Sequence, residues 1–180
     1  MGGHLALQAA LAVPGRIDGV VLVDPFGSVA DGGAIAMAET LAARLLPETR
    51  QRAAEVGEAI AGGNPSPELG AEFLALQWPG YFAQPESAPP PPPGLLLNFS
   101  CNGETMASVF GELQSGFADR LAGCEVPVEL VAGQRSPLPF AVSEQTAKLL
   151  PRSQLTIVPD AGHLPWHEQP GCVRAALARL

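Results

Sequence analysis

The sequence predicts an α/β fold in which three parallel strands are flanked by helices and a helical insertion follows the first strand. Three apolar stretches are predicted strands: "GVVLVDP" (19–25), "VPVELVAG" (126–133) and "SQLTIVP" (153–159). Helical patterns precede the first strand and follow the other two, and this alternation is typical of right-handed parallel crossovers. The 19 Pro and 20 Gly residues gather mostly in the middle of the 180-residue chain, between two segments of ordinary hydrophobic patterning. That shift in composition marks the insertion.

The first segment contains one helix and one strand. The stretch "GHLALQAALA" (3–12) is rich in Ala and Leu and stops before Pro14 and Gly15, as a short buried helix does. The β-branched run that follows ends at Asp-Pro, which predicts a strand over 19–24. We therefore expect a helix followed by a buried parallel strand.

The insertion runs from Gly27 to about Asp119 and is predicted to be mainly helical. We expect helices near 34–61, 67–78 and 104–121, separated by "GGNPSP" and "SAPPPPPG". The five prolines at 89–93 favour an extended left-handed conformation. With no basic residue beside them, a rigid spacer is favoured over a docking ligand.

The last segment resumes the alternation of strand and helix. A strand over 127–132 is followed by a helix over 141–150, a strand over 154–158 and a closing helix over 167–180. The three strands are expected to form one parallel sheet, with the insertion over their carboxyl ends.

Charge and cysteine content exclude several classes of protein. Ten Lys and Arg against 18 Asp and Glu give a net charge of −8, without a basic run that would neutralise phosphates, so nucleic acid is not an expected partner. No stretch has the length and apolarity of a membrane span or a secretory signal. Cys101, Cys124 and Cys172 are widely separated and lack metal or redox spacing, which indicates reduced thiols in the cytoplasm.

His163 is the candidate catalytic residue, because "PDAGHLP" places it directly after the third strand. Ligands of open α/β sheets bind at the carboxyl ends of strands, and an imidazole is the usual general base near neutral pH. A surface or purely structural histidine is the alternative. His4 and His167 lie on predicted helices without such a loop and are expected to be structural.

Three stretches together resemble the α/β-hydrolase family. "MGGHLALQAALAVPGRIDGVVLVDP" is similar to the segment after the nucleophile elbow, "VPVELVAGQRSPLP" to the penultimate strand and "DAGHLPWHEQPGCVRAAL" to the histidine loop and final helix. The resemblance implies a partial α/β-hydrolase fold. It divides the chain into a core segment (1–27), a helical cap (28–118) and a second core segment (119–180).

The resemblance also suggests what precedes the chain. Families of this type often contain G-H-S-M-G-G at the elbow, where the serine occupies a sharp strand-to-helix turn. In that alignment Gly2 is the closing glycine, and the backbone N–H of Met1 belongs to the oxyanion hole. The nucleophilic serine is then expected one residue before Met1, and no serine of this sequence lies in a G-x-S-x-G context.

The acid that orients the histidine has several candidates. Such families usually place Asp in the loop after the penultimate strand, but here that loop contains Ser136, which has no charge to offer. Some members carry the acid one strand earlier, and Asp24 occupies that strand end. Asp24 as a turn cap before Pro25 remains the alternative. Asp160 lies only three residues from His163 and is a weaker candidate.

The resemblance implies hydrolysis of an ester, amide or related bond of a small-molecule substrate, without metal or organic cofactor. The other hypothesis is a non-catalytic truncated product or binding module that keeps the sheet edge and the cap. The stretch "LALQWPGYF" (74–82) suggests a partly apolar pocket, although Trp78, Tyr81 and Phe82 are equally consistent with the core of the cap itself. The bond type and the oligomeric state are left open.

Overall fold

A computed structural model describes residues 1–63, 66–95 and 98–180, and its three strands confirm the predicted sheet. The strands are β1 (Val20–Val23), β2 (Val128–Gly133) and β3 (Ser153–Val158). They lie in the order β1-β2-β3, and both pairs are parallel. Val20 is opposite Val128, which in turn is opposite Ser153. The fold class is therefore α/β, with three parallel strands in one open sheet.

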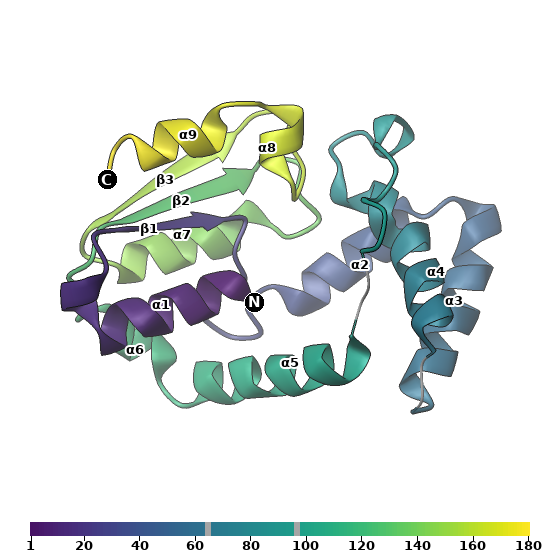
Figure 1. Cartoon of the computed structure of the whole chain (residues 1–180), viewed down its shortest axis with the longest axis horizontal. Coiled ribbons are helices and arrows are strands. Elements are labelled where there is room, and N and C mark those ends of the chain that lie inside the picture. The colour runs from purple at the N-terminus through teal and green to yellow at the C-terminus, as the bar shows by residue number, and fades with distance from the viewer. Residues whose placement is uncertain (64–65, 96–97) are drawn as a thin grey trace.

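Helices cover both faces of this sheet (Figure 1). On one face lie α1 (Gly2–Ala12), α6 (Phe117–Leu121) and α7 (Phe140–Leu149), whereas α9 (Cys172–Leu177) covers the other face. The larger core cluster includes Leu7, Leu22, Phe117 and Leu130, which are all almost completely buried. Burial of such large apolar side chains supplies the main driving force for folding.

The insertion contributes the helices at the carboxyl ends of the strands. These are α2 (Ala34–Arg44), α3 (Pro47–Ala61), α4 (Pro67–Gln77) and the short helices η2 (Trp78–Tyr81) and η3 (Pro85–Ser87). In Figure 1 the strand arrowheads point toward α2, α3 and α4. The insertion therefore lies where the sequence predicted it. Its last helix, α5 (Phe99–Gln114), instead buries Val109 and Leu113 in the larger core cluster.

Two predicted long helices are broken by proline and glycine. The expected helix over 34–61 is divided into α2 and α3, because Leu46 precedes Pro47 and is extended, with ψ of 147°. The expected closing helix over 167–180 is divided into α8 (Pro165–Glu168) and α9, with Gly171 in the left-handed region at φ of 98°. The sequence patterns correctly predicted helices in these regions but did not predict where each helix is interrupted.

The helix expected over 104–121 begins earlier and is divided into α5 and α6. Its first part, α5, starts after Asn98, whose side chain accepts a hydrogen bond from the backbone N–H of Cys101 at 2.9 Å. This N-cap satisfies one of the free amides of the first turn. Gly116, with φ of 82°, separates α5 from α6.

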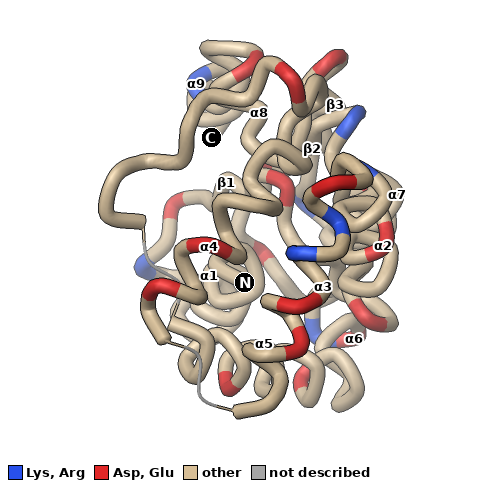
Figure 2. Tube along the Cα trace, turned by 90° about the vertical axis from the view of Figure 1, so that its right-hand side faces the viewer, with Lys and Arg blue, Asp and Glu red and all other residues tan. Residues whose placement is uncertain are grey.

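Acidic residues are spread over several helices, including the exposed faces of α3 and α4 (Figure 2). None of the described helices combines the length and the apolar character that crossing a bilayer requires. Of the prolines at 89–93, the first four lie outside helices and strands and the last begins a turn, and the Pro89 carbonyl accepts a hydrogen bond from the Trp78 indole at 2.6 Å.

Candidate active site

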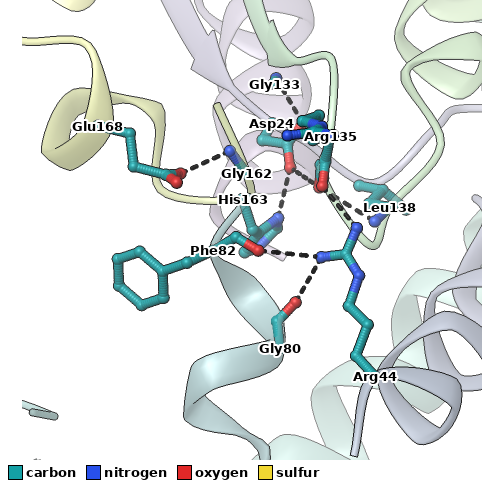
Figure 3. Close-up of polar contacts among 11 residues, drawn as sticks. Asp24, Arg44, Gly80, Phe82, Gly133, Arg135, Leu138, Gly162, His163 and Glu168 are labelled. Carbon is teal, nitrogen blue, oxygen red and sulfur yellow. Dashed lines mark hydrogen bonds and ion pairs between the residues drawn. The ribbon is translucent and has the colours of Figure 1, made fainter. Parts of the chain in front are cut away.

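The candidate site is formed by the three loops that follow β1, β2 and β3 (Figure 3). Asp24 is the first residue after β1, Ser136 lies in the loop after β2, and His163 lies in the loop after β3. Parallel strands bring these loops to one edge of the sheet although they are far apart in the sequence. The fold therefore assembles the residues that the sequence analysis singled out.

Asp24 and His163 are in direct contact. The carboxylate oxygen Oδ2 of Asp24 lies 2.5 Å from Nδ1 of His163, across 139 positions of sequence. An ionised carboxylate can only accept hydrogen bonds, so Nδ1 of His163 carries the proton in this contact. In the neutral imidazole the other nitrogen, Nε2, is then left as a proton acceptor.

Asp24 is held rigidly at the end of β1. Its side chain is only 1% exposed, and its backbone N–H donates to the Val131 carbonyl at 2.7 Å. Its backbone has a positive φ of 43°, a conformation that Asp tolerates better than most residues. The other carboxylate oxygen, Oδ1, accepts a hydrogen bond from the Gly133 N–H at 3.3 Å. Burial with several donors is how a carboxylate remains charged inside a protein.

Ser136 belongs to this cluster but does not contact the imidazole. Its hydroxyl donates to Oδ2 of Asp24 at 2.5 Å and accepts the Leu138 N–H at 3.0 Å. The residue at the usual acid position therefore supports the carboxylate at Asp24. The alternative interpretation, in which Asp24 merely caps a turn, did not anticipate this set of donors.

Asp160 lies away from the candidate site. Its side chain is 76% exposed, and its carboxylate is 3.8 Å from the Arg135 guanidinium. The structure thus brings together Asp24 and His163 and leaves the weaker acid candidate in solvent.

The other two histidines have different surroundings. His4 is buried on α1, with its ring centroid 4.2 Å from that of Phe117 and its Nε2 3.3 Å from the Gln8 amide. Burial lowers the pKa of His4 below its ordinary value. His167 lies on α8, with its ring 6.2 Å from that of Phe82.

The loop that carries His163 packs tightly against the cap. The His163 backbone N–H donates to the Tyr81 carbonyl at 2.7 Å. A Cβ at Gly162 would overlap that same Tyr81 carbonyl, and one at Gly133 would overlap the Gly162 carbonyl. Only glycine permits this approach of three backbone segments, so the "AGH" sequence is a packing requirement as well as a loop signal.

A cavity of about 720 Å³ opens beside His163, between the sheet edge and the cap. Its walls are mostly aliphatic and aromatic, and its polar side chains include Arg50, Gln77 and Asn102. Trp78 and Tyr81 line it as the sequence suggested, whereas Phe82 is buried against Trp78 and Leu74 in the cap core. Both interpretations of the 74–82 stretch therefore hold in part. An apolar cavity with a few polar groups is the usual form of a small-molecule site.

Met1 lines the same cavity as His163. Partial burial lowers the pKa of its α-amino group below the ordinary value. Met1 is the start of α1, and the chain end lies toward the cap side of the molecule (Figure 1). The structure thus places Met1 and His163 at one cavity.

Two further residues of the site were missed by sequence reasoning. The Arg44 guanidinium donates to the carbonyl oxygens of Gly80 and Arg135, each at 2.6 Å, and the Glu168 carboxylate accepts two backbone N–H groups. No pattern near Arg44 in the sequence indicates that its side chain donates to backbone carbonyl oxygens. Nor does the sequence around Glu168, which lies between His167 and Gln169, indicate that its carboxylate binds backbone N–H groups.

Comparison with known proteins agrees with this fold. A family model described as "Alpha/beta hydrolase family" matches residues 1–176. A proline iminopeptidase from Mycobacterium smegmatis is similar in structure with a TM-score of 0.58 and 18% identity, over 98% of this chain and 60% of that one. A thermophilic esterase from Thermogutta terrifontis matches with a TM-score of 0.54 and 22% identity, over 99% and 60%.

A third solved structure, Est816, described as an N-acyl homoserine lactone degrading enzyme, matches with a TM-score of 0.55 and 21% identity, over 99% of this chain and 64% of that one. The chain spans between 54% and 64% of the length of the structures compared. At these identities the likeness shows the fold. Because the family model covers nearly the whole sequence, the chain belongs to the alpha/beta hydrolase family.

Proposed function

We propose that this chain is the C-terminal part of a serine hydrolase in which His163 is the general base and Asp24 the acid that orients it. The observation that carries the proposal is the 2.5 Å contact between Asp24 Oδ2 and His163 Nδ1 beside the cavity. In such a triad the carboxylate holds the imidazole in one tautomer and stabilises the imidazolium that forms.

The nucleophile of the complete protein is proposed to be a serine directly before Met1. Among the described residues that line the cavity there is no serine, threonine or cysteine. Met1 and His163 line the same cavity, which supports a nucleophile directly before Met1. The partial coverage of the solved relatives is consistent with an upstream segment.

The proposed reaction proceeds through an acyl-serine. Nε2 of His163 accepts the serine proton while the serine oxygen forms a bond to the carbonyl carbon of the substrate. The protonated His163 then gives that proton to the leaving oxygen or nitrogen as its bond to carbon breaks. Water repeats the sequence to release the acid. The N–H of Met1, which is an amide in the complete protein, donates to the oxyanion.

The substrate is proposed to be a small molecule with an apolar group that enters the cap cavity. The aliphatic side chains of Met37 and Leu41 and the ring of Tyr81 form part of its walls. An ester is the simplest bond for a test, and amide or related bonds are compatible with the same chemistry. No metal or organic cofactor takes part in these steps. The three cysteines, which are free in the structure, are consistent with the proposed cytoplasmic location.

The first experiment asks whether the missing nucleophile exists. The reading frame upstream of the Met1 codon is expected to continue through a strand and a Gly-x-Ser sequence. The extended protein should be labelled by a fluorophosphonate probe, and the Met1–Leu180 chain should not. A stop codon directly upstream of the Met1 codon, together with no labelling of the Met1–Leu180 chain, would favour the non-catalytic alternative.

The second experiment tests the roles of the two site residues. In the extended protein, His163→Ala should abolish labelling, because the serine loses its base. His167→Ala is the matched control, since His167 contacts Phe82 in the cap and does not line the cavity. Labelling that survives His163→Ala would refute the proposed role of His163.

A further inference from the structure

Four consecutive residues of the cap, Gly80–Ala83, are bound through their backbones at the edge of the candidate site (Figure 3). The Gly80 and Phe82 carbonyls accept hydrogen bonds from Arg44, at 2.6 and 3.3 Å. The Tyr81 carbonyl accepts the His163 N–H, and the Ala83 N–H donates to Glu168. This segment is the part of the cap in direct contact with the loop that carries His163.

Glu168 joins this segment to the histidine loop. Its Oε1 accepts the Ala83 N–H at 2.8 Å, and its Oε2 accepts the Gly162 N–H at 2.6 Å. Gly162 directly precedes His163 in the chain. One carboxylate therefore binds two backbone segments, and both bonds have the added strength of an ionised acceptor.

Arg44 completes the connection on the other side of the segment. Besides the cap carbonyls, it donates to the Arg135 carbonyl at 2.6 Å, and the Arg135 N–H donates to the Ala161 carbonyl at 2.9 Å. Burial and the neighbouring Arg135 charge lower the pKa of Arg44, and the Glu168 charge opposes that shift. The loops after β2 and β3 and the cap segment are thus held as one unit.

We propose that Glu168 is a positioning residue, which fixes the backbone of His163 by binding the N–H groups of Gly162 and Ala83 together. The inference rests on the proposed function for its effect on catalysis, because it concerns where Nε2 of His163 lies relative to the cavity. Asp24 fixes the Nδ1 side of the ring, and Glu168 fixes the main chain from which the ring projects. A small displacement of a catalytic group is enough to slow a reaction strongly.

Glu168→Gln is the informative substitution, because it keeps the size of the side chain. Glutamine has one acceptor oxygen and an NH₂ group, so one of the two N–H groups loses its partner. Glu168→Asp keeps the charge but is one methylene shorter and is expected to give an intermediate result. Glu125→Gln is the matched control, since Glu125 is exposed in the loop before β2, at the opposite end of the strands.

The first measurement is amide hydrogen exchange of the Met1–Leu180 chain at low protein concentration, followed by mass spectrometry of its peptides. In Glu168→Gln the N–H of His163, which Glu168 does not touch, should exchange at least about tenfold faster, as local opening predicts. Exchange within β2 should stay unchanged. Unchanged exchange at His163 would overturn the proposal. Loss of protection throughout β2 would also overturn it, because Glu168 would then support the whole fold.

The second measurement is made on the extended protein with an ester substrate. Glu168→Gln should lower kcat about tenfold or more and change KM less than about twofold, since a misplaced base affects the chemical step. Glu125→Gln should leave both constants unchanged. Faster exchange at His163 with an unchanged kcat would refute the positioning role. Activity that survives His163→Ala would refute the proposed function instead, so the two failures are distinguishable.

Discussion

The hydroxyl of Ser136 donates to Asp24 Oδ2 at 2.5 Å, and this is the same oxygen atom that contacts His163. A serine at the usual acid position thus binds a carboxylate that comes from the preceding strand. The charge lies at the end of β1, whereas its hydrogen-bond donor lies in the loop after β2. This arrangement leads to different predictions for substitutions of Asp24 and of Ser136.

Asp24→Asn in the extended protein should lower kcat by roughly 10³–10⁴-fold, the effect of losing the orienting charge in a related triad. The amide keeps the shape of the side chain, so the fold should be retained. Ester hydrolysis and circular dichroism measure the two effects. Asp160→Asn is the matched control, because Asp160 is 76% exposed and its recorded ion-pair partner is Arg135. If Asp160→Asn were the more damaging change, the acid assignment to Asp24 would be wrong.

Ser136→Ala should lower kcat about three- to tenfold, the value of one hydrogen bond of about 0.5–1.5 kcal/mol. From the sequence alone we would have expected almost no effect, since the serine carries no charge. In an Asp24→Asn background the same change should do less, because the two side chains act through one contact. A double-mutant cycle of kcat measures this coupling. Strictly additive effects would show that Ser136 does not act through Asp24.

The size of the cap cavity should determine which acyl chains are accepted. Ala38 on α2 lines the cavity, so Ala38→Phe should raise KM for longer acyl esters about tenfold while short esters are little affected. Ala43→Phe is the control, because Ala43 lies on the same helix, is exposed and is not among the lining residues. Equal effects of the two changes across a series of p-nitrophenyl esters would argue against this cavity as the acyl site.

Acid should destabilise the chain through His4. Burial lowers the pKa of His4 below its ordinary value of 6.5, so the unfolded chain binds a proton more readily than the folded one. The free energy of unfolding therefore falls as the pH falls through 6.5 toward the lowered value. His4→Phe should remove this part of the pH dependence. Urea unfolding of the unsubstituted chain and of His4→Phe, each at about pH 7.5 and about pH 5.5, measures this pH dependence. A stability difference between the chains that is the same at both pH values would contradict the prediction.

The edge of β1 should make the Met1–Leu180 chain prone to self-association. Within the described residues β1 pairs only with β2, and its other edge presents free backbone groups beside apolar side chains. Light scattering of this chain should increase with concentration, and the extended protein, whose added strands are proposed to pair with β1, should remain monomeric. A monomeric chain with a cooperative melt at micromolar concentration would show that the edge is protected in another way.

Local pattern alone was sufficient for the type of most elements. The apolar runs at 19–25, 126–133 and 153–159 form the three strands, and continuous hydrophobicity is the local sign of burial on both faces, which is complete for β2 and partial for β1 and β3. The loop "PDAGHLP" identified His163 because the glycine that permits close packing is adjacent in the sequence. The positions of helix breaks were less accurate, since Leu46 and Gly171 interrupt stretches whose composition remains helical.

Contacts between distant segments were decided only by the tertiary structure. The sequence offered Asp24, Ser136 and Asp160 as residues near the acid position, and the sheet order places Asp24 in contact with His163 because β1 and β3 flank β2 and bring their loops together. The roles of Arg44 and Glu168 depend on backbone carbonyl and N–H groups, which every residue carries and which therefore leave no trace in the sequence. What the amino-acid sequence determined was the kind of chemistry available at each strand end; which of these groups meet was determined by the geometry of parallel strands and the packing of the cap.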